Sequence, residues 1–257
     1  MQRLYGKTLA ELGEIAQALS FPSYTAKQIA QWLYQHHINH IDEMNNLSKT
    51  ARDKLKERFT LGLSAPVRVQ ISKDGTKKYL YSLAGGRFIE AAYIPDNDRG
   101  TLCVSSQMGC KMGCLFCMTG KQGFQANLTV NEILNQIRCL PEWHELTNIV
   151  FVGMGEPLDN IDNLMKSLEI LTSDWGYARS PKRITVSTIG IIPTMKTFLE
   201  NSHCHLAVSL HSPFNEERKK LMPVEMSTLS MKSFNFSKIT IGQVSADCHS
   251  NISCSKD

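Results

Sequence analysis

Apolar residues recur at helical spacing in the N-terminal quarter of the chain. Thr8 and Glu11 form a capping box in front of the first apolar stripe. A second stripe begins near Thr25, and Ser48 can cap a third helix. The pattern predicts a small helical domain over residues 1–62.

Short alternating segments separated by tight turns follow in residues 63–98. The segments VRVQIS and KKYLYSL flank the turn KDG at 73–75, and RFIEAAYI follows a second turn at Gly85-Gly86. An Asp-Gly pair between two such segments is typical of a β-hairpin. We therefore expect a small β meander that links the helical domain to the rest of the chain.

Strand and helix patterns then alternate over residues 99–225. The expected strands are TLCVSS, TNIVFVG, KRITVST and HLAVSL, and the expected helices cover residues 128–140, 161–172, 193–201 and 215–221. Such alternation implies right-handed crossovers and a parallel sheet. The fold class is therefore α/β, and ligands are expected at the carboxyl ends of the strands.

Composition indicates the class of protein and its compartment more than its function. The chain has 257 residues, of which 42% are hydrophobic and 20% charged, and its net charge is +4. These values exclude disorder as the main state and permit a nucleic-acid partner without requiring one. The sequence holds no apolar run long enough for a membrane span and no secretory signal, so we expect a cytoplasmic protein. In a reducing compartment, its eight cysteines favour metal binding or catalysis over structural disulfides.

The sharpest chemical feature is the segment GCKMGCLFCMTG, which follows the first alternating strand. Its cysteines are Cys110, Cys114 and Cys117. Thiolates suit iron–sulfur clusters and zinc. Three thiolates on a compact loop would leave one iron of a [4Fe–4S] cluster open for S-adenosylmethionine, with Phe116 packed beside that cofactor. Zinc ribbons usually carry two CxxC pairs, and this chain has one, so the cluster is the favoured interpretation.

Other polar residues also fall at strand ends. Gly155 and Glu156 lie in the segment GMGE, where the backbone and the carboxylate can receive an amino group. Ser187 ends the third strand, and Ser209, Leu210 and His211 end the fourth. Each of these features in isolation is typical of an ordinary turn or strand end.

Two residues carry no signal of their own. Cys103 lies in the first alternating strand, where a lone cysteine usually acts as a small buried hydrophobe. Glu90, in the meander, has the pattern of a solvated strand carboxylate. Cys139 and Cys204 are interpreted as packing residues.

Four motifs together resemble the RlmN/Cfr family of radical S-adenosylmethionine RNA methyltransferases: GTLCVSSQMGCKMGCLFCMTGKQGF, FVGMGEPLDN, KRITVSTIG and AVSLHSP. The resemblance covers roughly residues 3–225. It implies a partial (β/α)6 barrel with an N-terminal helical accessory domain that helps hold RNA. It also implies methylation of an adenosine in 23S rRNA and in certain tRNAs, at C2 in the RlmN branch and at C8 in the other. The implied cofactors are a [4Fe–4S] cluster and S-adenosylmethionine, and the implied partners include an electron donor such as flavodoxin.

The resemblance also assigns roles to residues. Cys110, Cys114 and Cys117 would hold the cluster, and Glu90 would accept a proton. Cys103 would release the product by attacking the sulfur of a second, methyl-carrying cysteine, which forms a disulfide. One residue departs from the family, since Ile189 replaces a frequent serine. The implied S-adenosylmethionine contacts are Gly155, Glu156, Ser187, Ser209, Leu210 and His211.

The pattern fails in residues 226–257, which are rich in serine. The family continues with two more strands, an asparagine that contacts the cofactor and the methyl-accepting cysteine, and Cys248 and Cys254 do not match that context. One back-translation of this tail, read two bases along, resembles the family's next helix and strand. The hypothesis is a frameshift near Glu225 that cuts the core after about four strands.

Such a cut would leave a strand edge uncovered. We therefore expect poor solubility and no methyl transfer by this chain alone. The alternative is a zinc- or cluster-bearing RNA-binding fragment without catalysis.

Overall fold

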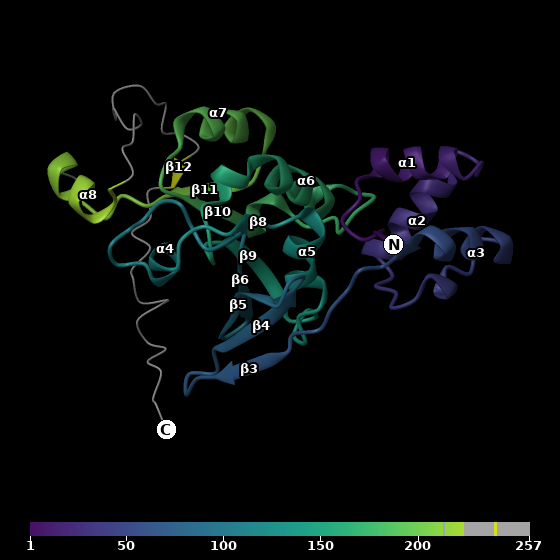
Figure 1. The fold of residues 1–257 in the computed structure, drawn as a ribbon, viewed down its shortest axis with the longest axis horizontal. Helices are drawn as coiled ribbons and strands as arrows, with labels where there is room; N and C mark the ends of the chain where they lie inside the picture. The colour runs from purple at the N-terminus through teal and green to yellow at the C-terminus, as the bar shows by residue number, and fades with distance from the viewer. Residues whose placement is uncertain (213, 224–238, 241–257) are drawn as a thin grey trace.

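The computed structural model describes residues 1–212, 214–223 and 239–240. Its N-terminal part contains the three expected helices, α1 (Leu9–Ala18), α2 (Thr25–Tyr34) and α3 (Lys49–Arg58), with the short 3-10 helix η1 (Ile41–Glu43) between the last two (Figure 1). The capping box of α1 is confirmed, because the Glu11 amide donates to the Thr8 hydroxyl and the Thr8 amide donates to the Glu11 carboxylate. Ser48 caps α3 by accepting from the amide of Ala51 at 3.2 Å.

The ends of this helical domain are held together by a strand pair that the sequence pattern did not predict. β1 (Gln2–Arg3) pairs in parallel with β2 (Phe59–Thr60). Two residues per strand are too few for a visible period, so only the fold reveals the pairing.

One mixed sheet forms the rest of the described chain, in the order β12-β11-β10-β9-β6-β5-β4-β3. Its strands are β3 (Arg68–Ile71), β4 (Lys77–Leu83), β5 (Arg87–Asp96), β6 (Arg99–Val104), β9 (Leu146–Phe151), β10 (Ile184–Thr188), β11 (His205–Val208) and β12 (Ile239–Thr240). β3 to β6 are antiparallel, whereas β6, β9, β10, β11 and β12 are parallel. The sheet does not close into a barrel within the described ranges, which agrees with a partial barrel.

The strands of the meander belong to the same sheet as the parallel strands. The meander is therefore part of the core sheet as well as the connection to the helical domain. β5 pairs with β6 along its C-terminal half, with Ala92 opposite Cys103 and Asp96 opposite Arg99. The tight turn between these strands contains Asn97 in the left-handed region, with φ of 47°. This pairing fixes the position of the meander relative to the predicted site.

The expectation of an uncovered edge after four parallel strands was wrong for part of that edge. β12 pairs in parallel with β11, with Ile239 opposite Leu206 and Thr240 opposite Ala207. Two residues of the tail therefore supply a short fifth parallel strand. Cys248 and Cys254 lie outside the described residues.

The crossover helices are α5 (Val130–Arg138), α6 (Ile161–Thr172) and α7 (Ile192–Asn201), and α8 (Asn215–Leu221) follows β11. The short elements are β7 (Gln107–Met108), β8 (Ala126–Asn127), α4 (Met118–Lys121), η2 (Pro157–Asn160) and η3 (Pro181–Arg183). The sheet face toward the core carries a run of buried apolar side chains, which are Leu102, Val104, Ile149, Phe151, Ile184, Val186, Leu206 and Val208. Alternation along the strands places Cys103, Val150 and Thr185 on the opposite face, which we call the inner face.

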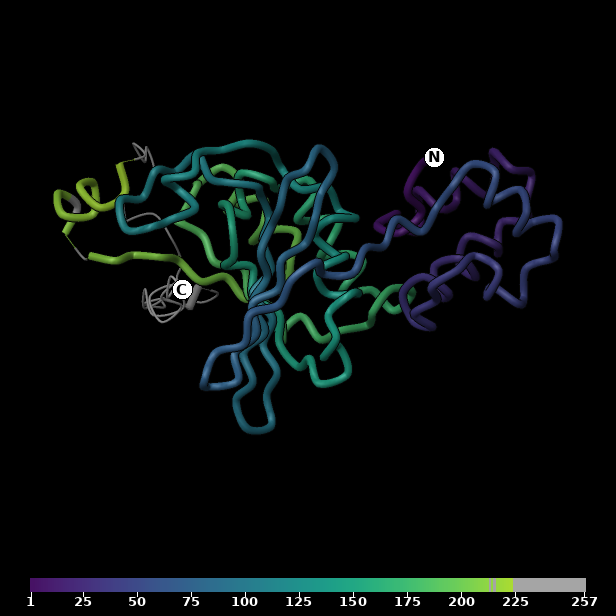
Figure 2. Tube along the Cα trace, turned by 60° about the horizontal axis from the view of Figure 1, so that its bottom comes forward, coloured from purple at the N-terminus to yellow at the C-terminus, as the bar shows by residue number. Residues whose placement is uncertain are grey.

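The helical domain lies at one end of the molecule and α8 lies at the other, with the sheet between them (Figure 2). Aromatic side chains join the helical domain to the core. The hydroxyl groups of Tyr5 and Tyr177 are hydrogen-bonded, and His37 stacks on Trp143 at 4.1 Å. Within the described ranges, no helix is both long and apolar enough to cross a membrane.

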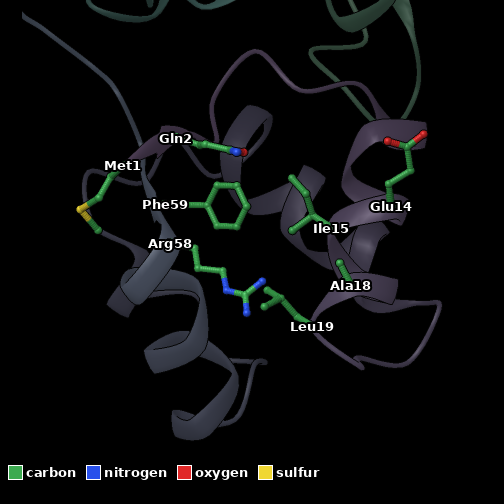
Figure 3. Close-up of a pocket in the computed structure, with 8 residues that line it drawn as sticks. All are labelled: Met1, Gln2, Glu14, Ile15, Ala18, Leu19, Arg58 and Phe59. Carbon is green, nitrogen blue, oxygen red and sulfur yellow. The ribbon is translucent and has the colours of Figure 1, made fainter.

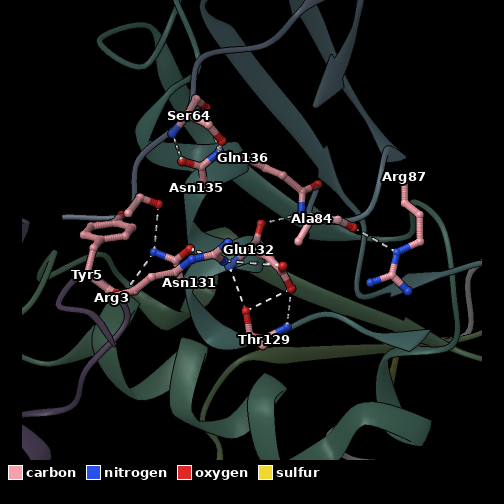
Figure 4. Close-up of polar contacts among 11 residues, drawn as sticks. Arg3, Tyr5, Ser64, Ala84, Arg87, Thr129, Asn131, Glu132, Asn135 and Gln136 are labelled. Carbon is pink, nitrogen blue, oxygen red and sulfur yellow. Dashed lines mark hydrogen bonds and ion pairs between the residues drawn. The ribbon is translucent and has the colours of Figure 1, made fainter. Parts of the chain in front are cut away.

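Helix α5 connects the helical domain, the linker and the end of β6 through three buried carboxamides. Figure 4 shows the contacts of Asn131 and Asn135. Asn131 donates to the carbonyls of Tyr5 and Gly62, each at 3.1 Å. Asn135 donates to the Ser64 carbonyl and accepts from its amide. Gln136 bonds both backbone groups of Ser105 at 2.9 Å.

We expect Asn131→Ala to lower the free energy of unfolding by about 2 kcal/mol, because the substitution leaves the buried carbonyl of Tyr5 and the half-buried carbonyl of Gly62 without this donor. Urea unfolding checks this expectation. Asn201→Ala is the matched control, since Asn201 is exposed at the end of α7 and donates to the carbonyl of Thr197 in the same helix. Equal unfolding midpoints for the two variants would contradict the prediction.

Candidate functional site

The loops that carry the predicted site residues leave the same edge of the sheet. The register pairs Val104 with Phe151, Val186 with Phe151 and Thr188 with Val208, so β6, β9, β10 and β11 end close to one another. The loop after β6 contains the three cysteines, and the loop after β9 contains GMGE. The structure therefore brings these loops together as parallel strands require.

The cysteine loop is closed at its base. β7 pairs with β8. Gly109 has φ of +73°, and an added Cβ would lie 1.7 Å from the Gly123 carbonyl oxygen, so no side chain fits there. Cys114 is buried and the side chains of Cys110 and Cys117 are half-buried. The Cys117 amide donates to the Cys114 carbonyl at 3.1 Å. No disulfide joins two of the six cysteines in the described ranges.

The three thiols influence one another electrostatically. The pKa of Cys110 and of Cys114 is raised to about 11, mainly by burial and to a smaller extent by neighbouring cysteines and Glu156. Cys114 packs in a small apolar cluster with Met112, Ile189 and Met222, and Cys110 and Cys117 border it.

Three soft thiol donors on a compact loop beside an apolar wall fit the donor set of an iron–sulfur cluster. Among the described residues, no group of three or more His, Cys, Asp or Glu side chains is arranged for a single metal ion.

Glu156 lies deep in the site, with 3% of its surface exposed. Its carboxylate accepts from the Thr188 hydroxyl at 2.5 Å, the Ile189 amide at 3.0 Å and the Leu158 amide at 3.1 Å. A carboxylate has about four acceptor positions, so these donors leave room for one more. Burial raises the pKa of Glu156 to about 7. The structure thus shows that this side chain binds the end of β10 to the GMGE loop, a role that the sequence did not indicate.

Gly155 and Gln107 complete this part of the site. Gly155 has φ of +98°, and an added Cβ would lie 2.4 Å from the Cβ of Gln107. Gln107 is fully buried, and its carboxamide accepts from the Glu156 amide at 2.8 Å and donates to Asp159 at 2.6 Å. Sequence reasoning gave Gln107 no role. Its position between a strand and the cysteine loop was the only available signal.

The ends of β10 and β11 contribute the remaining predicted residues. The hydroxyl oxygens of Ser187 and Ser209 are 3.5 Å apart, and the Ser209 amide donates to the Thr188 carbonyl. Leu210 packs against the main core. His211 has φ of 57°, and its ring lies 4.4 Å from the ring of Phe116. Burial, and then the charge of Arg218, lower the pKa of His211, which favours its neutral form.

Cys103 and Glu90 share the inner face. Ala92 is opposite Cys103, and Glu90 lies two residues from Ala92, so the Glu90 and Cys103 α-carbons are diagonal neighbours about 7–8 Å apart. Cys103 is buried, whereas Glu90 is half-exposed and forms an ion pair with Lys78 at 3.1 Å. Strand register explains this proximity, which neither residue type indicates by itself.

The structure also contains a hollow of about 670 Å³ in the helical domain (Figure 3). It is lined mainly by apolar side chains and lies between α1 and the end of α3, remote from the cysteine loop. None of the predicted site residues lines it. Its lining residues are Met1, Gln2, Glu14, Ile15, Ala18, Leu19, Arg58 and Phe59.

Comparison with known proteins agrees with this geometry. Residues 104–229 match the model of the radical SAM superfamily, which places the core in that class. Residues 2–61 match the ribosomal RNA large subunit methyltransferase N-terminal domain. The chain belongs to the RlmN family, because it is 55% identical over 241 residues to a probable dual-specificity RNA methyltransferase RlmN of Bacteroides fragilis and covers 70% of that protein.

Other relatives support the same assignment. The probable RlmN of Parabacteroides distasonis is 61% identical over 224 residues, which are 87% of this chain and 65% of that protein. The crystal structure of a radical SAM methyltransferase from Sphaerobacter thermophilus superposes with a TM-score of 0.79 at 40% identity, and the match covers 87% of this chain and 67% of the other. The chain thus spans about two thirds of the length of these relatives.

Proposed function

We propose that this chain provides the cofactor-binding core and the RNA-contacting helical domain of an RlmN-type methyltransferase, acting on adenosine C2 in 23S rRNA and tRNA in the cytoplasm. The observation that supports the proposal best is the cysteine loop at the carboxyl edge of four parallel strands. The helical domain, which matches the family's own N-terminal domain, supports an RNA substrate.

In this proposal Cys110, Cys114 and Cys117 hold a [4Fe–4S] cluster. When bound, the cluster and S-adenosylmethionine would supply the one-electron chemistry that generates the radical needed for methylation. Glu156 keeps the loop after β9 against the end of β10, and its remaining acceptor position suits the cofactor's amino group. The paired hydroxyls of Ser187 and Ser209 suit ribose or carboxylate oxygens.

The inner face has a different role. An adenine placed against it would meet both Glu90 and Cys103, since these residues are diagonal neighbours. Glu90 would accept the proton that leaves the base, and its ion pair with Lys78 keeps the carboxylate positioned for this. Cys103 would attack the sulfur of the methyl-accepting cysteine that the family carries further along the chain. The disulfide would form as the carbon–sulfur bond to the product breaks, so release depends on that second cysteine. A flavodoxin-type protein would supply electrons.

One experiment tests the proposal. The chain is reconstituted anaerobically with iron and sulfide, then incubated with S-adenosylmethionine, dithionite and a 23S rRNA fragment or tRNA. Mass spectrometry measures 5′-deoxyadenosine and 2-methyladenosine. We expect 5′-deoxyadenosine from the loaded chain; 2-methyladenosine as well would show that this chain completes the transfer. A colourless zinc protein that forms neither product would contradict the proposal.

A further inference from the structure

Helix α8 is docked on the cysteine loop, although no motif pointed to it. The Leu115 amide, inside the loop, donates to the carbonyl of Leu221 at the end of α8 at 2.9 Å. The next residue, Met222, is 2% exposed and packs in the apolar cluster that contains Cys114. Figure 1 shows α8 on the same side of the molecule as α4, which directly follows the cysteines.

Arg218 extends this contact to the strand ends. One guanidinium nitrogen, Nη2, donates to the Ile189 carbonyl at 2.7 Å and to the Ser209 carbonyl at 3.3 Å. These carbonyls follow β10 and β11. Ile189 and Cys114 belong to the same small apolar cluster. Arg218 therefore connects three parts of the site, which are two strand ends and the wall of the cysteine loop.

The charge of Arg218 lies close to the cysteine loop. Its guanidinium donates to the Ile189 carbonyl, and Ile189 belongs to the apolar cluster that contains Cys114. Arginine remains protonated in proteins, so this charge is permanent. Lys219, the next residue, is 71% exposed and pairs with Glu216 at 3.3 Å, so its charge is directed to solvent.

We infer that Arg218 is a positioning residue of the cluster site, which holds the ends of β10 and β11 against the cysteine loop and places a fixed positive charge beside Cys114. The inference rests on the proposed function. A cluster with three thiolate ligands is anionic and becomes more so when a reductant such as dithionite adds one electron. A nearby guanidinium stabilises the reduced form and raises the reduction potential.

The test compares Arg218→Met, Arg218→Lys and the matched control Lys219→Met after anaerobic reconstitution. The ratio of reduced to oxidised cluster is measured by EPR at a fixed applied potential, and cluster retention is measured as iron loss to a chelator. For R218M we expect a ratio lower by on the order of tenfold, which corresponds to 59 mV for a one-electron couple. R218M should also lose iron faster. K219M removes the same charge from α8 and should match the wild type in both measurements.

R218K separates charge from positioning. Lysine keeps the charge but not the planar guanidinium that reaches both carbonyls, so we expect a ratio near that of the wild type and faster iron loss. If R218M does not fold, the inference is tested with R218K alone. R218K that loses iron at the wild-type rate would overturn the inference. An unchanged R218M, or a K219M variant that shifts as much as R218M, overturns it as well. A wild-type chain that takes up no cluster overturns the proposed function together with this inference.

Discussion

Replacing Cys114 with serine is expected to abolish cluster uptake by the reconstituted chain. Cys114 is the most buried of the three loop cysteines, and its sulfur lies in the apolar cluster with Met112, Ile189 and Met222. A serine hydroxyl is a hard, protonated donor that iron–sulfur clusters rarely accept. We expect the bound iron to fall from about four atoms per chain to less than about one atom per chain. Iron analysis and the visible absorption band measure this.

Two other cysteines provide the control. Cys139 and Cys204 are half-buried like Cys110, and burial likewise raises the pKa of each. Neither lies on the cysteine loop. Cys139→Ser and Cys204→Ser should therefore retain a full complement of iron. A C114S variant that holds as much iron as C204S would show that the loop is not the cluster site.

Glu156 is expected to make the stability of the chain fall as the pH rises from about 4.5 to 7. Burial raises the pKa of its carboxyl from 4.5 to about 7 in the folded state. Between these values the unfolded chain has lost this proton while the folded chain keeps it, so each increase in pH favours unfolding. Over the whole window the effect amounts to about 3 kcal/mol, because one pKa unit corresponds to about 1.4 kcal/mol. Below pH 4.5 both states are protonated and the effect vanishes.

The comparison with Glu156→Gln isolates this group. The glutamine is neutral at every pH, so the free energy of unfolding of E156Q should lack this slope. E156Q should be the less stable chain near pH 4.5, since its amide NH2 faces a backbone donor. The difference should shrink by about 3 kcal/mol toward pH 8. Urea unfolding across this range measures it, and Glu216→Gln, an exposed site on α8, should leave the wild-type slope intact. A parallel pH profile for E156Q would refute the prediction.

Local signals in the sequence predicted most of the elements. The capping residues Thr8 and Ser48 start α1 and α3, and α6 and α8 have the bounds that apolar spacing indicated. Such features depend on side chains within a few residues of one another. The sequence missed the pairing between distant segments, such as β1 with β2. It also missed the pairing of β5 with β6, although these two strands are neighbours in the chain. The hydrophobic period of a strand does not specify which strand pairs with it, because many strands could form the same backbone hydrogen bonds.

The candidate site divides in the same way. The sequence by itself determined the cysteine loop and its chemistry, since Cys110, Cys114 and Cys117 lie within eight consecutive residues and need no other segment to form a donor set. Only the tertiary structure decided that the Glu156 carboxylate faces Thr188, and that Arg218 joins β10, β11 and the loop. The physical reason is that hydrogen bonds and charges act through space, and the fold brings together groups up to 32 residues apart in the chain.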